Sequence, residues 1–267
     1  RGLGDVYKRQ QQVSAFFRFA LQLFPRPFLI RVSQCLYPLL DWWYRGKGFI
    51  DPINGKSYRK FLPYGYQKQR LNVLSPGTLS LERHRLLWLY FDRETDFFDR
   101  PADVLHIAPE QAFLKRFQKI KHRSYITSDL HSPLADVQAD ICNLPFSDHQ
   151  FDWIICNHVL EHIQNDSTAM KELYRVLKPG GCAILQVPLR LDQNTFEDNS
   201  ITDPKERARV FGQYDHVRIY GKDYQNRLEK VGFHVRMLAY AEQLTPEEQL
   251  RYAVPVNEII PVCKKAS

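Results

Sequence analysis

The sequence has no CxxC spacing and an odd number of cysteines. Its five cysteines are scattered at Cys35, Cys142, Cys156, Cys182 and Cys263. Disulfide frameworks and structural zinc sites need paired, regularly spaced cysteines. The pattern therefore excludes a disulfide scaffold and favours a reducing compartment, for which we expect a cytoplasmic location.

The sequence also lacks a long apolar run. No stretch approaches the roughly 20 apolar residues of a membrane-spanning helix, and no signal-peptide cleavage pattern is present. Residues 13–50 are rich in aromatic and aliphatic residues but are interrupted by Arg18, Arg26 and Arg31 and by Pro25 and Pro27. They predict short basic amphipathic helices that either pack against the rest of the protein or make peripheral contact with the inner face of a membrane.

The chain has 267 residues, enough for one α/β domain with an appendage. Its formal charge of +7 is uneven, because residues 11–75 contain ten Lys/Arg against two Asp/Glu. The basic character therefore belongs to the N-terminal part and says little about the rest of the chain. Because a solvated basic surface is more common than a nucleic-acid site, we expect nucleic acid to be an unlikely partner. Residues 1–10, RGLGDVYKRQ, resemble translated adapter sequence, and we expect them to be non-native.

The chain is organised around residues 103–163. Short apolar runs at 104–108, 125–127, 139–141 and 153–156 alternate with loop and helical segments. Apolar strands of this kind indicate a parallel sheet that is covered on both faces. Ligands of such sheets bind outside the carboxyl ends of the strands. Polar residues follow each run, so the sequence predicts a nucleotide-type pocket at that edge.

The order of motifs in this region resembles the class I S-adenosylmethionine (SAM)-dependent methyltransferases, type 11 group. The motifs are D-I-x-x-L-P-F at 140–146, F-D-x-I at 151–154, H-V-L-E-H at 158–162 and R-V-L-K-P-G-G at 175–181. The resemblance implies SAM as cofactor and a Rossmann-like, doubly wound sheet of seven mostly parallel strands with an antiparallel last strand, within residues 81–267. The family's glycine-rich first loop is replaced by His106-Ile107-Ala108-Pro109-Glu110, a variant that a subgroup shares together with D-H-V-R-x-Y-G, here 215–221.

The resemblance assigns the cofactor contacts residue by residue. Asp129 would hold the ribose hydroxyls, with Leu130 beside it, although Asp129 could instead cap the following turn. Asp140 and Ile141 would meet the adenine. The remaining positions belong to the methionine end and the sulfonium: His106, Ala108, Pro109, Glu110, Asn157 and His158.

Two of these positions have structural alternatives. Glu110 stands at the start of a helix, where the dipole favours a carboxylate, or it meets the ammonium group of the methionine end. For His106 we expect a buried, hydrogen-bonded histidine on the strand.

A long polar insertion follows the fifth strand, and this is where the family places acceptor-binding residues. Asp215 could orient His216 as a general base. Arg218 could hold an anionic acceptor group, or the whole insertion could be an ordered polar loop. His158 and His162 share a helical face, but the sequence offers no third ligand, so we expect no metal. His162 either acts in chemistry or braces the loop.

Residues 51–80 resemble a zinc ribbon whose ligands have been lost. The four ligand positions carry Asp51, Asn54, Ser75 and Thr78 instead of cysteine. Because structural zinc requires thiolate or imidazole ligands, we expect a metal-free ribbon-like segment. A helix is expected over 81–98, with surface ion pairing for Glu82, Arg83 and Arg85 unless they line the pocket entrance. Another helix should end at a glycine cap formed by Gly180 and Gly181.

These patterns predict a SAM-dependent methyltransferase that acts on a small-molecule or cell-envelope acceptor. A non-catalytic relative that only binds SAM or a nucleotide is the alternative. A nicotinamide-dependent oxidoreductase is disfavoured, because the first loop has no Gly-x-Gly-x-x-Gly.

Overall fold

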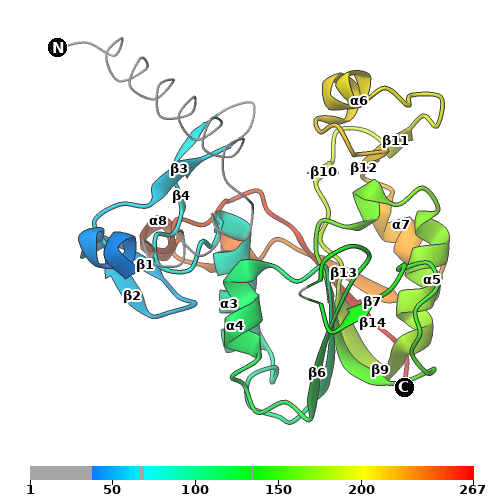
Figure 1. Cartoon of the computed structure of the whole chain (residues 1–267), viewed down its shortest axis with the longest axis horizontal. Helices are drawn as coiled ribbons and strands as arrows, with labels where there is room; N and C mark the ends of the chain where they lie inside the picture. Colours follow the sequence, from blue (N-terminus) through cyan, green and yellow to red (C-terminus); the bar gives the residue numbers. More distant parts are fainter. Residues whose placement is uncertain (1–37, 66–68, 134) are drawn as a thin grey trace.

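The computed structural model describes residues 38–65, 69–133 and 135–267, and its centre is a seven-stranded sheet (Figure 1). The strands lie in the order β13-β14-β9-β8-β5-β6-β7, and β14 is antiparallel to both of its neighbours while the pairs from β9 to β7 are parallel. The predicted mostly parallel sheet with an antiparallel last strand is confirmed. In chain order the strands are β5 (Asp103–Ile107), β6 (Ser124–Asp129), β7 (Val137–Gln138), β8 (Phe151–Cys156), β9 (Leu177–Ile184), β13 (His234–Leu238) and β14 (Ile260–Lys264).

Strand β8 shows why the sheet is buried on both sides. Successive side chains of a strand point to opposite faces, and here those from Trp153 to Cys156 are all apolar. Trp153 and Ile155 belong to the core formed with α3 (Glu82–Glu94) and α4 (Gln111–Phe117). Ile154 and Cys156 belong to the core formed with α5 (Asp166–Val176) and α7 (Tyr224–Glu229). The continuous apolar run in the sequence therefore reflects helices on both faces.

One predicted helix end is wrong. The glycines were expected to cap α5, but α5 ends at Val176 and Leu177, its C-cap, is already extended. The register of β9 against β8 jumps between Leu177 and Cys182, so the intervening residues bulge out of the strand. Gly180, at φ 75°, supplies the left-handed backbone conformation that this bulge needs.

The N-terminal appendage consists of two small antiparallel pairs. Strand β1 (Arg45–Asp51) pairs with β2 (Lys56–Tyr58), and β3 (Leu62–Tyr64) pairs with β4 (Arg70–Leu74). Residues 45–50 therefore form a strand, not the amphipathic helix expected through residue 50. The expectations for residues 1–37, including the non-native start and the basic amphipathic helices, lie outside the described residues.

Hydrogen bonds hold the ribbon-like turns of the appendage together. The buried Asp51 carboxylate accepts bonds from the Thr78 hydroxyl, from the Ser80 hydroxyl at 3.2 Å and from the Ile53 amide at 3.0 Å. Ser75 Oγ accepts from an amide of its own turn, and Asn54 Oδ1 does the same. Oxygen atoms at all four ligand-like positions are thus engaged in hydrogen bonds within the protein.

Arg85 of α3 joins the appendage to the sheet domain. Its side chain is fully buried, so the expected surface ion pairing is wrong for this residue. The guanidinium donates to backbone carbonyls on both sides: Val73 and Ser80 of the appendage at 2.9 Å, and Tyr252 and Ala253 after α8 (Pro246–Tyr252) at 2.7 Å. The guanidinium carbon also lies 4.5 Å from the centroid of the Phe61 ring, in a cation–π contact. A single buried cation therefore ties three separate segments together.

The polar insertion forms a small sheet above the carboxyl ends of the central strands, at the top of Figure 1. Its strands are β10 (Leu189–Arg190), β11 (Phe196–Glu197) and β12 (Arg218–Gly221), with α6 (Pro204–Phe211) between the last two. Two short 3-10 turns, η1 (Leu160–His162) and η2 (Tyr240–Gln243), complete the elements. Over the described residues, none of the helices combines the length and apolar character that crossing a membrane requires.

Candidate cofactor and acceptor site

The carboxyl ends of three of the parallel strands present buried polar atoms that have no partner among the described residues. They are Ser128 Oγ in β6, Asn157 Oδ1 just after β8 and Gln186 Nε2 just after β9. All three residues are 5% exposed or less. Buried polar atoms are normally hydrogen-bonded, so this row marks the place where a polar ligand would complete the structure.

The first loop turns sharply without a glycine. Ala108 adopts φ 46°, and its amide donates to the Ser128 carbonyl at 2.7 Å. Left-handed conformations normally favour glycine, and a non-glycine residue there stores strain of about 1 kcal/mol or more. Pro109 then leads directly into Glu110, the N-cap residue of α4. The loop therefore keeps a tight turn, with Ala108 in the conformation that glycine usually adopts.

Glu110 points back into the site and does not cap its helix. Its side chain makes no cap hydrogen bond. Instead Oε2 lies 2.6 Å from Nε2 of the fully buried His106, and Oε1 accepts from Asn157 Nδ2 at 3.0 Å. Burial alone would raise the Glu110 pKa, but the hydrogen bond and charge of His106, with smaller contributions from His84 and Asn157, lower it to about 2. Glu110 is thus a fixed carboxylate between the ends of β5 and β8.

His84 of α3 adds a neutral imidazole to this network, which the sequence analysis did not identify. Its Nδ1 accepts from the Leu81 amide at 3.1 Å, and its Nε2 lies 3.9 Å from Glu110 Oε1. Burial lowers the His84 pKa to about 3, although the nearby Glu110 charge acts in the opposite direction. His84 therefore presents an N–H toward Glu110 at neutral pH.

The buried state of His84 predicts a loss of stability in mild acid. Between its unfolded pKa of about 6.5 and its folded pKa of about 3, the unfolded chain binds a proton that the folded chain does not. The free energy of unfolding should therefore fall as pH drops through this window, by at most about 1.4 kcal/mol per pH unit from this group. Urea unfolding at several pH values should show a shallower dependence for His84→Gln. The exposed His131→Gln should keep the wild-type slope, and equal slopes for all three proteins would contradict the assignment.

The residues expected at the ribose and adenine lie where the sequence analysis placed them, at the ends of β6 and β7. Asp129 Oδ1 accepts from the amides of His131 and Ser132 at 2.8 and 2.7 Å, so the turn-capping interaction is present. Asp140 Oδ1 accepts from the Cys142 amide at 2.8 Å. These bonds use one oxygen of each carboxylate. Leu130 is exposed and Ile141 is buried, so apolar side chains flank both carboxylates.

His158 connects the strand end to the polar cluster behind it. Its backbone is left-handed, at φ 56°, and its amide donates to the Gln186 carbonyl at 2.8 Å. Its Nδ1 lies 3.4 Å from Glu161 Oε1. The H-V-L-E-H motif forms a 3-10 turn, η1, at Leu160–His162, where the sequence suggested a regular helix. Glu161, which the sequence analysis did not assign, is buried in this turn.

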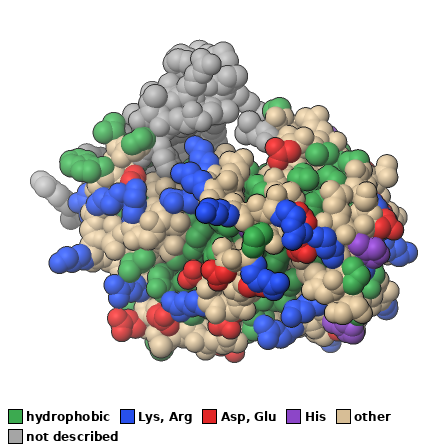
Figure 2. Space-filling view, turned by 90° about the horizontal axis from the view of Figure 1, so that it is seen from below, with side chains coloured by type: hydrophobic (Ala, Val, Ile, Leu, Met, Phe, Trp, Pro, Cys, Tyr) green, Lys and Arg blue, Asp and Glu red, His purple; other side chains and the backbone are tan. Residues whose placement is uncertain are grey.

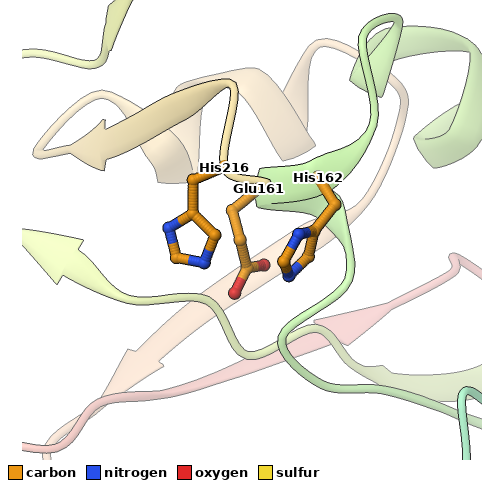
Figure 3. Close-up of side chains that lie close together, drawn as sticks. All are labelled: Glu161, His162 and His216. Carbon is orange, nitrogen blue, oxygen red and sulfur yellow. The ribbon is translucent and has the colours of Figure 1, made fainter. Parts of the chain in front are cut away.

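The structure brings His216 of the insertion next to His162, as Figure 3 shows. Their ring centroids are 4.7 Å apart, and His162 Nδ1 lies 3.4 Å from Asp215 Oδ2. Asp215 therefore contacts His162, whereas the sequence analysis paired it with His216. Burial lowers the His216 pKa, so its imidazole is neutral at neutral pH. A neutral imidazole can either accept a proton or bind a metal.

Arg218 is a structural anchor in this arrangement. It is buried, and its three guanidinium nitrogens donate to the Leu160, Ile163 and Gln164 carbonyls and to the Glu197 carboxylate. The expected contact with an anionic acceptor is not supported, because these nitrogens already have protein partners. Arg218 instead fixes β12 against η1, which positions His216.

Two of the hollows on the described surface lie at opposite ends of the central strands. One, of about 250 Å³, lies at the carboxyl ends of the strands and is lined in part by Glu82, Arg83, His158, Val187 and Leu189. Glu82 also pairs with Arg70 at 2.6 Å. The other, of about 900 Å³, lies at the amino ends, where Figure 2 shows acidic and basic side chains interspersed on the surface. Since ligands of open α/β sheets bind at the carboxyl ends, the smaller hollow belongs to the candidate site.

Comparisons with known proteins find similarity to methyltransferases in the sheet domain. Residues 93–185 match the family model Methyltransf_11, described as a methyltransferase domain. A tRNA U34 carboxymethyltransferase of Nautilia profundicola is 28% identical over 148 residues, which cover 55% of this chain and 46% of the relative. A demethylmenaquinone methyltransferase of Staphylococcus saprophyticus is 40% identical over 58 residues, which cover 22% and 24%. The chain thus spans less than half the length of these relatives. A solved SAM-dependent methyltransferase from Archaeoglobus fulgidus is 13% identical with a TM-score of 0.45, covering 70% of this chain and 96% of that one.

The strand order and the family match concern the same part of the chain. Residues 93–185, which contain the strands from β5 to β9, are similar to the methyltransferase domain of this family model.

Proposed function

We propose that this chain transfers the methyl group of SAM to a small-molecule acceptor at the carboxyl ends of β6, β8 and β9. The observation that supports this most is the row of unpaired, buried polar atoms on Ser128, Asn157 and Gln186. A polar ligand that fills this place would complete their hydrogen bonds, whereas without one they remain energetically costly.

We assign the cofactor contacts on the same geometry. The Glu110 carboxylate, supported by His106 and Asn157, meets the ammonium of the methionine end, and the loop backbone at Ala108 and Pro109 passes beside it. The second oxygen of Asp129 accepts from the ribose hydroxyls. Asp140 and Ile141 meet the adenine, which Leu130 covers. His158 borders the sulfonium. Residues 81–267 form the catalytic domain in this proposal, and residues 51–80 its ribbon-like appendage.

The chemistry then depends mainly on positioning. SAM carries an activated methyl group, so transfer is an in-line displacement for which the protein supplies orientation. With a hydroxyl acceptor, the hydroxyl loses its proton, the C–O bond forms and the S–CH₃ bond breaks with its electrons remaining on sulfur. The products are a methyl ether, S-adenosylhomocysteine and a proton. Neutral His216 stands on the acceptor side of the site as a group that can take this proton.

The acceptor is best matched by a small molecule. The hollow beside His158 has a volume of about 250 Å³, slightly below the range of about 300–1,000 Å³ that is usual for ligand pockets. A hollow of this size favours a small acceptor group over a bulky one. A cell-envelope component is a further acceptor class, reached by a protein that works in the cytoplasm or at the inner membrane face. The named activities of the relatives add quinones and tRNA to the classes that deserve testing.

The proposed function is tested with the full chain and SAM labelled in its methyl group. The protein is incubated separately with a small-molecule extract, a quinol, a lipid extract and tRNA, and label transfer and S-adenosylhomocysteine are measured. We expect label in a small-molecule fraction above a heat-denatured control. Label confined to tRNA would overturn the acceptor assignment. SAM binding without transfer to any fraction would instead favour a binding module.

The ribose assignment predicts a separate effect of Asp129→Asn. Asparagine keeps an acceptor for the amides of the following turn but removes the charge that would hold two ribose hydroxyls. Loss of a hydrogen bond to a charged group costs about 1.5–3 kcal/mol, so the SAM dissociation constant should rise by about 10- to 150-fold. Calorimetric titration measures this, with the exposed Asp99→Asn as matched control. Unchanged affinity in Asp129→Asn would remove Asp129 from the ribose role.

A further inference from the structure

A third potential metal ligand, which the sequence could not reveal, lies beside the H-V-L-E-H motif. The insertion brings His216 to Glu161 and His162, and one ligand atom from each residue lies within 4.8 Å of the other two (Figure 3). Glu161 and His162 come from η1, whereas His216 lies just before β12. The histidine pair that the sequence suggested, His158 and His162, is therefore not the pair that the structure assembles with a carboxylate.

Glu161 carries the strongest sign that a cation is needed here. The residue is 2% exposed, and its Oε2 is buried with no hydrogen-bond partner among the described residues. Its Oε1 has only the 3.4 Å contact with His158 Nδ1. Burial of a carboxylate oxygen without a donor or cation costs several kcal/mol. Asp215 Oδ1, beside His162, is also buried and unpaired within the described part of the chain.

The backbone around the cluster is rigidly braced, as a metal site requires. The Val217 amide donates to the Glu161 carbonyl at 2.9 Å, and the Tyr220 hydroxyl donates to the Leu160 carbonyl at 3.3 Å. Arg218 adds its bonds to the carbonyls of η1 and of the residues after it. These contacts hold His216 at a fixed distance from Glu161 and His162. Metal sites depend on such supporting contacts to orient their ligands.

We propose that Glu161, His162 and His216 bind a first-row divalent transition metal such as Mn²⁺, Co²⁺ or Zn²⁺. Two imidazoles and one carboxylate suit these ions, whereas Mg²⁺ and Ca²⁺ prefer oxygen ligands alone. Ligand atoms about 2.0–2.2 Å from one ion lie about 3–4 Å from each other. The present separations, of at most 4.8 Å, are not far above this range.

The ion would also define the acceptor class, and this part rests on the proposed function. The cluster adjoins His158 and the end of β8, on the side where the acceptor would approach the sulfonium. A site with three protein ligands keeps coordination positions open. These positions would take an oxygen of the acceptor and favour its ionised form, so the acceptor class is one with a hydroxyl group. While the ion is bound, the lone pair of His216 is engaged, so the proton of the acceptor hydroxyl would pass to bulk water. His216 would act as the base only in the metal-free protein.

The test uses the chelator-treated full chain and Co²⁺ alone as the probe. We expect one equivalent to bind and to produce visible absorption bands from imidazole and carboxylate ligation, with Mn²⁺ or Zn²⁺ competing. Glu161→Gln and His216→Gln should each weaken binding at least about tenfold. His234→Gln, an exposed histidine on β13, is the matched control and should bind like wild type. Circular dichroism confirms that each variant is folded.

The outcomes separate this inference from the proposed function. No Co²⁺ binding by wild type, or equal binding by both ligand variants and the control, would overturn the metal site. A SAM titration of the same samples is then scored independently. SAM binding without metal binding would leave the methyltransferase proposal intact, and metal binding without SAM binding would remove that proposal while supporting the site.

Discussion

Replacing Arg85 with methionine should lower the free energy of unfolding by about 3–5 kcal/mol, the loss typical of breaking a buried charged network. The substitution removes the Arg85 donor from the carbonyls of Val73, Ser80, Tyr252 and Ala253, of which Ser80 keeps the amide of Ser75 as a partner. Each buried carbonyl that loses its partner costs about 1–3 kcal/mol before relaxation. Methionine has a similar length, so loss of packing is a minor contribution.

Chemical denaturation monitored by fluorescence measures this effect directly. Arg85→Lys should recover only part of the stability, because one ammonium cannot reproduce the planar, multi-donor geometry of guanidinium. Arg100→Met is the matched control, since Arg100 is exposed and pairs only with Asp96 four residues earlier; its loss should stay below about 1 kcal/mol. Similar losses at Arg85 and Arg100 would contradict the anchoring role.

Replacing Glu110 with glutamine should weaken SAM binding by about 10- to 100-fold while the protein remains folded. With a pKa of about 2, Glu110 is charged at neutral pH, and glutamine removes the charge proposed to meet the methionine ammonium. Hydrogen bonds to charged groups contribute about 1.5–3 kcal/mol. Glutamine also disturbs the contact with His106, so some loss of thermal stability should accompany the loss of affinity.

The two effects can be separated by measuring affinity and stability on the same samples. The exposed Glu247→Gln should change neither quantity. If Glu110→Gln lowers only the melting temperature and leaves the SAM dissociation constant unchanged, Glu110 is a structural group that fixes His106 and Asn157, and the ammonium assignment is wrong.

The fold was predictable because its information is local. The strands β5 and β8 contain short apolar runs, and helical spacing marks the segments between the runs, so the two-sided burial of residues such as Ile154 and Ile155 follows from the sequence pattern. The run at 139–141 was less informative, because β7 forms just before it, at Val137–Gln138. Where several local structures fit the same residues, the prediction failed. Pro179-Gly180-Gly181 reads equally well as a helix cap or as a bulge, and only the pairing of β9 with β8 decides between them.

The position of a candidate residue was predictable where it stands at or directly after the end of a strand, as Asp129 and Asn157 do. It was not predictable where packing between distant segments decides the environment. His84 lies on a helix before the sheet begins, and nothing in its local sequence indicates that it faces Glu110. An arginine at position 218 is equally suited to bind an anionic acceptor or the carbonyls of a turn, so its identity does not indicate its role. Only the position of that turn, residues 160–164, shows which contact it makes.

The most direct test of the central claim is a calorimetric titration of the full chain with SAM and with S-adenosylhomocysteine. The account predicts saturable binding of both ligands at one site per chain. The buried polar atoms of Ser128, Asn157 and Gln186 have no partner among the described residues, and a bound ligand would supply their hydrogen bonds. Absence of binding by a sample that circular dichroism shows to be folded would contradict it. The glycine-free loop at Ala108 would then mark a pocket that has lost its cofactor.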